Sequence, residues 1–412
     1  MSLHSRPAVR SPLEGLLTAL PLVAASLVSN AHAVEPDASW PDVLEEARGQ
    51  TVWFNAWGGS DRINEYLEWV DGEVRREYGV TLEHVKVGDI AEIVSQLAAA
   101  RAAGQDSDGR VDLMWVNGEN FAAMKEGGMI LGAFADDLPN AALVRESSSI
   151  TFDFSVAVEG LESPWGGAQL VFIHDMATLP EPPRSAGQLL AFVQDEDGRF
   201  AYPAPPAFHG TTFLKQLLIE LVEERHVDAL VLPAEASDVE AVTAPLWDYL
   251  DALHPHLRGE GRTWPANGEA TRQLLDDGEL DIALSFNPNE ASAAVRDGQL
   301  PDSVRTYVFD GGTIGNTHFV TIPWNASAAA GAQVVANFLL SPAAQARKAD
   351  PVHWGDPTVL AMEALDDGER ALFEAVDLGP WSLPIGTGSV LPEPHASWAA
   401  ALENAWLTRY GS

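Results

Sequence analysis

Strands and helices alternate in the hydrophobic pattern of the first part of the chain. The apolar run at 51–57 predicts a strand that Gly58-Gly59 ends. The helix that follows has one apolar face, formed by Ile63, Leu67, Val70 and Val74. Runs at 80–85 and 111–116 predict two more strands, separated by a helix over 90–103. This β-α-β-α-β order predicts a parallel sheet with helices on both faces.

The rest of the chain continues this alternation. Strands are predicted at 169–173, 201–202, 281–285 and 317–323, and helices at 211–224, 245–253, 267–277 and 290–297. From Ala328 onward the pattern is mostly helical. A chain of 412 residues without an internal repeat is too long for one ordinary core. The sequence therefore predicts an α/β protein with two lobes.

The apolar run at the start of the chain has a different character. It spans residues 15–28. Residues 1–10 carry two arginines and no acid, and Ala31-His32-Ala33 follows the run. This order is typical of a secretory signal peptide. A helix of 14 residues would reach only ~21 Å, short of the ~30 Å core of a bilayer. We expect cleavage after Ala33 and a soluble periplasmic protein that begins at Val34.

Composition narrows the chemistry. The chain has no cysteine, which excludes disulfides, thiolate metal sites and a lipid-modified cysteine. Its 60 acidic and 24 basic side chains give a net charge of −36, which argues against binding to nucleic acid or an anionic membrane. This charge indicates either cationic ligands or, as we favour, a halophile-like acidic surface that keeps the protein soluble in salt.

Signatures of catalysis and of cofactor binding are scarce. The sequence lacks the G-x-S-x-G and H-E-x-x-H motifs, the glycine-rich dinucleotide fingerprint and a P-loop. The pair His254 and His256 is separated by a proline, which forbids the helical spacing of a metal site. We therefore expect no enzyme activity, no cofactor and no metal.

Several stretches resemble one known family. The phrase F-L-L-S-P-x-x-Q at 338–345 closes many of its members, and Phe319–Pro323 stands shortly before it. Residues 169–175 and 182–190 match a strand with an Asp turn and a helix start. These residues resemble the periplasmic solute-binding proteins of ABC importers, the extracellular family 1, type II group. Residues 53–63, 117–121 and 352–358 are similar to the YnjB-type branch of that family.

The resemblance implies a fold and a partner. It implies a type II periplasmic-binding-protein fold, in which two α/β lobes with parallel-rich sheets are joined by a hinge and close on a small ligand. The ligand would then pass to the permease subunits of an ABC transporter in the inner membrane. We expect a first lobe over 34–163, a second lobe over 164–300, and a return to the first lobe with C-terminal helices over 301–412. We also expect a monomer.

Candidate binding residues lie where strands give way to helices. In open parallel sheets, ligands bind beyond the carboxyl ends of the strands. These junctions, with a crossover at 164–169, give the candidates Trp57, Gly58, Gly59, Asp61, Asn117, Glu119, Trp165, Gln169, Asn287, Asn289 and Glu290. Each also has a simpler explanation, because glycines form turns, asparagines cap helices and tryptophans fill cores.

The ligand class stays open at this level. Tryptophans near Asp61, Glu119 and Glu290 suit a cationic, thiamine-like solute, which ring faces and carboxylates would hold. A sugar fits nearly as well. The family that the chain resembles also includes polyamine and iron binders, but beyond Tyr202 and His209 no cluster of Tyr and His for ferric iron is evident. An anion fits less well because these junctions lack Arg and Lys. The alternative function is an exported hydrolase or lyase that uses cleft carboxylates on a small polar substrate.

Overall fold

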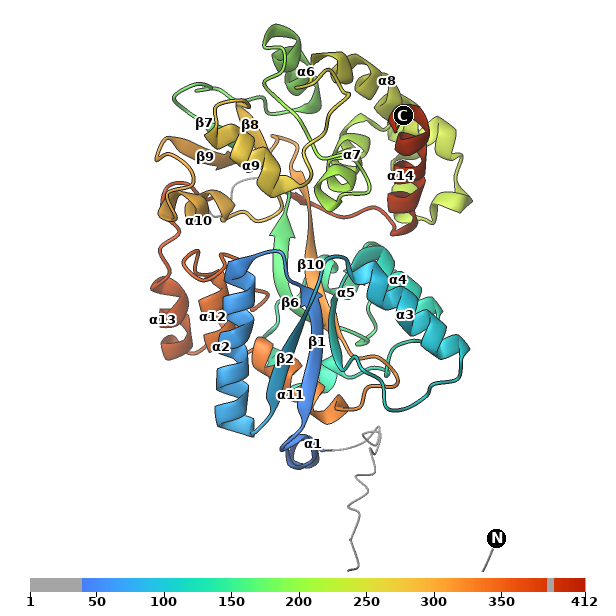
Figure 1. The fold of residues 1–412 in the computed structure, drawn as a ribbon, viewed down its shortest axis with the longest axis vertical. Coiled ribbons are helices and arrows are strands. Elements are labelled where there is room, and N and C mark those ends of the chain that lie inside the picture. Colours follow the sequence, from blue (N-terminus) through green and yellow to red (C-terminus); the bar gives the residue numbers. More distant parts are fainter. Residues whose placement is uncertain (1–38, 384–388, 412) are drawn as a thin grey trace, which may run out of the picture.

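The computed structural model describes residues 39–383 and 389–411. The expected signal peptide and its cleavage site after Ala33 lie outside the described residues. Figure 1 shows two lobes, one above the other along the longest axis, with β6 (Ser163–Gln169) and β10 (Thr313–Thr321) running between them. These two strands pair antiparallel and form the hinge.

The first lobe is built on a mixed sheet. Its elements are α1 (Trp40–Ala47), β1 (Thr51–Trp57), α2 (Asp61–Tyr78), β2 (Thr81–Val87), α3 (Ile90–Ala102), β3 (Leu113–Val116), α4 (Gly118–Glu126), η1 (Ala135–Asp137), η2 (Pro139–Leu143), α5 (Ser148–Thr151), β4 (Phe152–Asp153), β5 (Val156–Ala157), α11 (Ala329–Leu339), α12 (Pro342–Ala349), η6 (Met362–Ala364) and α13 (Asp367–Glu374). Strand β1 pairs parallel with β2 and β3, as predicted, whereas β10 runs antiparallel to β3. Helices α1, α2 and α11 cover one face, and α3 and α4 cover the other.

Helix α2 shows how the sequence pattern forms this lobe. The four residues predicted to share its apolar face are all buried, at 5% exposure or less, in the core beneath the sheet. Gly79 ends the helix with φ of 72°, a left-handed conformation that favours glycine. The predicted pattern and the observed packing therefore agree over this element.

The second lobe has a smaller sheet with a different topology. Its elements are β7 (Val171–Asp175), α6 (Ala186–Asp195), α7 (Phe208–Leu221), η3 (Glu224–Val231), η4 (Ala234–Ala236), α8 (Val239–Leu253), η5 (His254–His256), α9 (Gly268–Asp276), β8 (Ile282–Ser285), α10 (Glu290–Arg296), β9 (Val304–Tyr307) and α14 (Ser397–Tyr410). Strand β7 pairs antiparallel with both β8 and β9, so the expected parallel arrangement is wrong here. Strand β7 continues the hinge strand β6 in the same direction, and β8 and β9 run in the opposite direction on either side of it.

The end of the chain also departs from expectation. We expected residues 301–412 to return to the first lobe. Helices α11 to α13 do so, but β9 pairs with β7, and α14 packs against α7. Trp398 and Trp406 of α14 are buried in the core of the second lobe. Their large apolar rings place this helix there. The short strand β11 (Val390–Leu391), which the pattern did not predict, pairs with β10 near the second lobe.

Two other predictions need correction. Residues 201–202 were expected to form a strand, but they are buried in irregular structure. Tyr202 is apolar over most of its surface and packs in the second core, so its burial alone produced the strand-like pattern. The strand expected at 317–323 begins earlier, at Thr313, because the hinge strand extends across both lobes.

Candidate functional site

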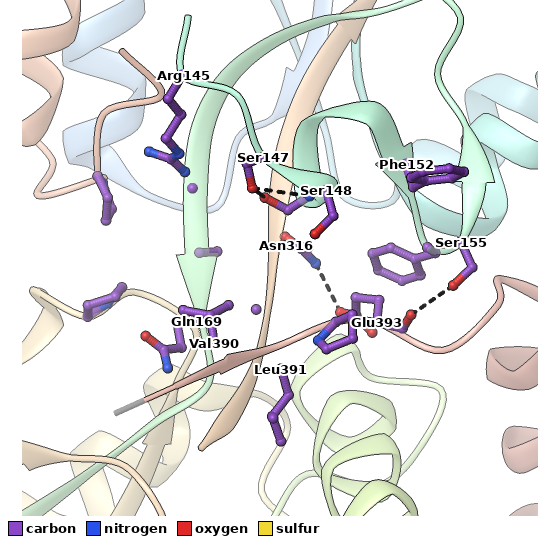
Figure 2. A pocket seen from close by; sticks show the side chains of 18 of the residues that line it. Arg145, Ser147, Ser148, Phe152, Ser155, Gln169, Asn316, Val390, Leu391 and Glu393 are labelled. Carbon is purple, nitrogen blue, oxygen red and sulfur yellow. Dashed lines mark hydrogen bonds between the residues drawn. The ribbon is translucent and has the colours of Figure 1, made fainter. Parts of the chain in front are cut away.

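A cavity of about 700 Å³ lies beside the hinge strands. Its wall is formed by Arg145, Ser147, Ser148, Ser149, Phe152, Phe154, Ser155, Gly167, Ala168, Gln169, Val231, Pro288, Gly315, Asn316, Pro357, Val390, Leu391, Pro392 and Glu393. Figure 2 shows these side chains converging from the first lobe, the hinge and β11. Val231 and Pro288 add contacts from the second lobe. The cavity is therefore an interlobe site.

Glycines in β6 and β10 allow close packing of the hinge strands beside the cavity. A Cβ added at Gly166 would lie 2.2 Å from both Asp356 Oδ2 and His318 Nε2, and one at Gly315 would lie 2.7 Å from the Ala168 carbonyl oxygen. Only glycine lets these backbones and side chains approach so closely. Gly167 is different, because its nearest neighbour, Arg145 Nη2, would be 3.7 Å away. A side chain at Gly167 would therefore fill space on the cavity side.

Glu393 joins the parts of the chain that meet at the cavity. Its carboxylate accepts hydrogen bonds from Lys215 Nζ of α7 at 2.6 Å and from Asn316 Nδ2 of β10 at 3.0 Å. Its backbone carbonyl accepts one from Ser155 Oγ of the first lobe at 3.1 Å. Burial raises the pKa of Glu393, and the ammonium group of Lys215 opposes this shift. The pair is almost fully buried and fixes β11 against both lobes.

Arg145 and a run of serines form another part of the wall. Arg145 follows η2, and its guanidinium donates to the Thr358 carbonyl. The hydroxyls of Ser147 and Ser149 lie 2.9 Å apart, and Thr317 Oγ1 of the hinge donates to Ser149 Oγ at 3.3 Å. Burial lowers the pKa of Arg145, and Asp356 opposes that shift. The wall thus presents a positive charge beside hydroxyl groups.

A buried polar cluster lies behind the glycine strand. Asp356 accepts a hydrogen bond from His318 Nε2 at 2.8 Å and pairs with Lys348, and all three side chains are buried. Burial lowers the pKa of Lys348, while Asp356 opposes the shift. Both carboxylate oxygens of Asp356 are engaged in this way. The cluster supports the hinge from outside the cavity.

The first sequence-predicted junction lies away from this cavity. The ring of Trp57 packs on the first core and would contact a Cβ added at Gly59. Gly58 donates its N–H to the Val87 carbonyl, and its own carbonyl accepts from Asn64. Asp61 is exposed at the start of α2. None of these residues is part of the cavity wall.

Trp165 requires a correction. We expected its ring to face the ligand, but it is completely buried in the first core. It contacts Phe54, Trp115 and Trp354. The pairing of β6 with β10 is irregular at this residue: Gly166 pairs with His318 and Pro164 with Phe319, which leaves Trp165 without a partner and breaks the alternation of faces. Gln169, from the same strand, lines the cavity and donates to Thr313 Oγ1 at 3.0 Å.

The remaining candidates hold the lobes together or begin helices. Asn287 and Asn289 of the second lobe donate their side-chain N–H groups to the carbonyls of Trp354 and Gly355 in the first lobe, at 3.4 and 2.6 Å. Glu290 pairs with Arg272 at 3.1 Å. The side-chain amides of Asn287 and Asn289 thus already form hydrogen bonds between the lobes. That these residues bind the ligand stays a prediction.

Asn117 and Glu119 flank the start of α4. Asn117 occupies the N-cap position without a side-chain cap, and Glu119 is exposed in the first turn. The N–H of Gly118 donates instead to the buried Asp153 at 2.5 Å. Neither Asn117 nor Glu119 belongs to the cavity wall. Glu119 is nevertheless close enough to raise the pKa of both Glu393 and Glu403.

Apart from Gln169, the sequence analysis missed the charged and polar residues of this cavity. Arg145 and Ser147 come from a loop that follows no predicted strand, and Asn316 lies inside β10, just before the run predicted at 317–323. Glu393 follows the two-residue strand β11, which is too short to give a pattern. The cluster of Arg145 with three serines in five positions was the available signal.

Other kinds of site are not found in the part of the chain that the structure describes. Residues 39–383 and 389–411 contain no group of His, Asp and Glu side chains arranged to hold a metal ion. Within the same residues, no helix is both long and apolar enough to cross a membrane.

The sequence places the chain in a family. Residues 61–368 match the family model described as bacterial extracellular solute-binding protein. The chain belongs to this family. Within it, the solute-binding protein is 47% identical to Protein YnjB of Escherichia coli strain K12 over 375 residues, which cover 91% of the chain and 95% of YnjB. The family resemblance noted in the sequence is confirmed.

Solved structures share the fold. The Tp0655 (TpPotD) lipoprotein of Treponema pallidum matches with a TM-score of 0.63 at 13% identity, over 87% of this chain and 98% of its own. The periplasmic binding protein AfuA from Actinobacillus pleuropneumoniae matches with a TM-score of 0.60 at 12% identity, over 88% and 99%. The predicted two-lobed type II fold is confirmed. Binding proteins of ABC importers bind small molecules and deliver them to permeases, and they are not enzymes.

Proposed function

We propose that this solute-binding protein captures a small polar solute in the cavity beside the hinge and delivers it to an ABC permease. The observation that carries this proposal is the composition of the wall, which combines both lobes, both hinge strands and β11. A ligand in such a place contacts surfaces that move relative to one another. It therefore stabilises the closed arrangement by its greater affinity for it.

The chemistry of the wall favours some of the solutes suggested by the sequence over others. The carboxylates expected to attract a cation, those of Asp61, Glu119 and Glu290, are not part of it. The carboxylate that is part of it, Glu393, is already paired with Lys215. A purely cationic, thiamine-like solute would therefore lack the carboxylate partners expected for it. A hydroxylated, sugar-like solute could form hydrogen bonds with the serine hydroxyls and side-chain amides of the wall. The structural neighbours do not distinguish between these solute classes, because they include a putative spermidine/putrescine ABC transporter, a ferric binding protein and a binding protein with fructose 6-phosphate bound.

The test begins with a thermal-shift screen of the mature protein against sugars, vitamins, amines, organic acids and phosphate esters. Small-angle scattering then compares the protein with and without each compound that binds. We expect a smaller radius of gyration in the bound state. An unchanged radius would contradict closure on the ligand.

A blocking variant locates the site. Gly167→Leu adds a side chain on the cavity side of β6, and we expect binding to be lost while the fold remains. Gly187→Leu is the control, because Gly187 is exposed on α6 and a Cβ there meets only Ser185 Oγ at 3.9 Å. Undiminished binding by Gly167→Leu would place the ligand elsewhere.

We also propose that the protein works as an unlipidated monomer in the periplasm after cleavage following Ala33. The support is the order of basic, apolar and small residues at the start of the chain, together with the lack of any cysteine. Mass spectrometry of the exported protein should find Val34 at its N-terminus, and light scattering should give the mass of one chain. An exported protein that still carries Met1 would contradict the cleavage.

A further inference from the structure

Arg145 is the cationic side chain in the wall of this cavity. The chain has 60 acidic and only 24 basic side chains, and within the described residues the guanidinium of Arg145 forms no ion pair. The charge that lies nearest, on Asp356, is already bound by Lys348 and His318. A half-buried guanidinium without a counterion in so acidic a protein calls for an anion from outside the chain.

The position of this guanidinium is defined by the first lobe. The backbone N–H of Arg145 bonds to the Val359 carbonyl at 3.0 Å, and Nη1 donates to the neighbouring Thr358 carbonyl. These two bonds anchor both ends of the side chain. Arginine carries five N–H donors in a planar fork, so most of them remain for a ligand. Nη2 lies over Gly167 in the cavity wall, as Figure 2 shows for the side chain as a whole.

Hydroxyl groups share the cavity wall with the guanidinium. Ser147 and Ser148, two and three positions after Arg145, line the same cavity. Serine hydroxyls rotate freely and can donate to an oxyanion. On the far wall the Glu393 carboxylate is bound by Lys215 and Asn316, so it does not compete for the guanidinium.

Asn316 supplies an acceptor on the hinge. Its side chain is 8% exposed and lines the cavity. The amide Nδ2 is bound to Glu393, and the oxygen Oδ1 is buried without a hydrogen-bond partner among the described residues. A buried acceptor of this kind is costly unless it receives a donor. A hydroxyl or amino group on the solute would supply one.

From these observations we infer that the cavity takes a solute with a carboxylate or phosphate group, held by Arg145 and Ser147–Ser148, and with a hydroxyl or amine donor directed at Asn316. This inference rests on the proposed function, whose ligand class it specifies. It also reverses the expectation from the strand junctions, which disfavoured an anion for lack of basic residues. Phe152, Val390 and Leu391 form the apolar remainder of the wall.

The experiment uses pairs of probes that differ only in the anionic group. Calorimetry compares fructose 6-phosphate with fructose, gluconate with glucose, and thiamine monophosphate with thiamine. A thermal-shift series with inorganic phosphate, at constant ionic strength, tests the anion alone. We expect at least one phosphate or carboxylate probe to bind more tightly than its neutral or cationic parent compound. The parent should bind at least tenfold more weakly.

Variants of Arg145 test the residue itself. In Arg145→Gln, the affinity for the anionic probe should fall about thirtyfold or more, as expected when a desolvated charge pair is broken. Arg145→Lys keeps the charge but loses the fork, and it should recover only part of the loss. Arg48→Gln removes the same charge from an exposed position on the first lobe and should bind like the parent protein. Circular dichroism checks that the variants are folded.

The outcomes separate this inference from the proposed function. If parent compounds bind as tightly as their anionic partners, or if Arg145→Gln binds the anionic probe normally, the inference is overturned while the receptor function stands. If no organic probe binds, the phosphate series decides. A stabilisation by phosphate that Arg145→Gln abolishes supports the anion subsite, and an equal effect or none in both proteins refutes it. Binding that survives Gly167→Leu overturns the proposed site as well.

Discussion

Glu162 has a carboxyl group with neither oxygen hydrogen-bonded within the described part of the chain, and the residue is fully buried. Burial raises its pKa well above the usual range, and the nearby Asp153 adds to the shift, whereas Lys125 opposes it. The native state therefore favours the protonated, neutral form of this side chain. In the charged form, the carboxylate would be buried without a hydrogen-bond donor among the described residues.

The sign of the resulting pH dependence follows from this shift. Below the pKa of the unfolded chain, about 4.3 for glutamate, Glu162 is protonated in both states. As the pH rises above that value, the unfolded state loses its proton first, so the free energy of unfolding falls until the raised native pKa is reached. In Glu162→Gln this loss should vanish. Urea unfolding at pH 4 and pH 7 should show the variant gaining stability over the parent at pH 7.

The control for this prediction is Glu146→Gln, which changes an exposed carboxylate of the same lobe. It should leave the difference between the two pH values as in the parent protein. If Glu162→Gln shows the parent's full pH dependence, the native state holds Glu162 charged, and our interpretation of the site is wrong.

At the level of elements, the start of α4 depends on one glycine. Gly118 has φ of 60°, and a Cβ there would lie 2.7 Å from the ring of Phe154. The left-handed backbone costs about 1–2 kcal/mol for a residue with a Cβ, and the clash adds to it. Gly118→Ala should therefore lower the free energy of unfolding by about 2 kcal/mol or more.

Gly72 provides the matched comparison. It lies inside α2, and a Cβ there meets nothing within 4 Å. Gly72→Ala should stabilise the protein by about 0.5–1 kcal/mol through helix propensity. Chemical denaturation of both variants checks the pair. Equal effects of the two substitutions would show that neither the backbone nor the ring contact at Gly118 matters.

The sequence predicted elements well where the periodic pattern was long. The apolar face of α2 and the run of β1 each supplied enough positions to define the element. The two-residue strand β11 did not, and β9 contains Arg305 and Thr306, so it lacks the apolar run that identified β3 and β8 at the same length of four residues. The junction residues were placed correctly in the chain, but their side chains make contacts to other segments. Asn289, for example, bonds to Gly355, 66 positions later, and no local pattern shows such a contact.

On the scale of the whole molecule, Arg62 links the two lobes across the hinge. From α2 of the first lobe it pairs with Asp297 at the end of α10, with one bond from Nε to Oδ2 at 3.1 Å. It also donates to the Val352 carbonyl at 2.7 Å. Because Asp297 is partly exposed, the pair contributes at most about 1 kcal/mol. That is still enough to shift the ratio of open to closed molecules about fivefold.

Arg62→Ala should therefore open the molecule. In scattering experiments without ligand, we expect the average radius of gyration to exceed that of the parent protein. Arg76→Ala is the control, because Arg76 lies on the same helix but pairs only with Glu73 and Glu77 of α2 among the described residues. If the scattering curves of Arg62→Ala and the parent protein superimpose, Arg62 does not affect the ratio of open to closed molecules.

The candidate cavity itself could not be predicted from the sequence, because it depends on how the lobes meet. The rule that ligands lie beyond the carboxyl ends of strands indicated loops at 57–61 and 287–290. In the structure, Arg62, next to the first loop, pairs with Asp297, and Asn289, in the second loop, bonds to Gly355 of the first lobe. Of these two loops only the second reaches the cavity, through Pro288, and most of the wall comes from β6, β10 and the segment around Glu393. The relative position of these three segments is a property of the assembled molecule.

The path of the chain between the lobes has a consequence for biosynthesis. The second core joins residues from Leu170 to Trp406, and the first core needs α11 as well as β1. Protein domains fold as units while the ribosome adds residues from the N-terminus. Neither core is complete until nearly the whole chain has been made, and the second waits for the last helix. During most of its synthesis the protein therefore remains unable to fold, which is the condition that threading through a narrow export channel requires.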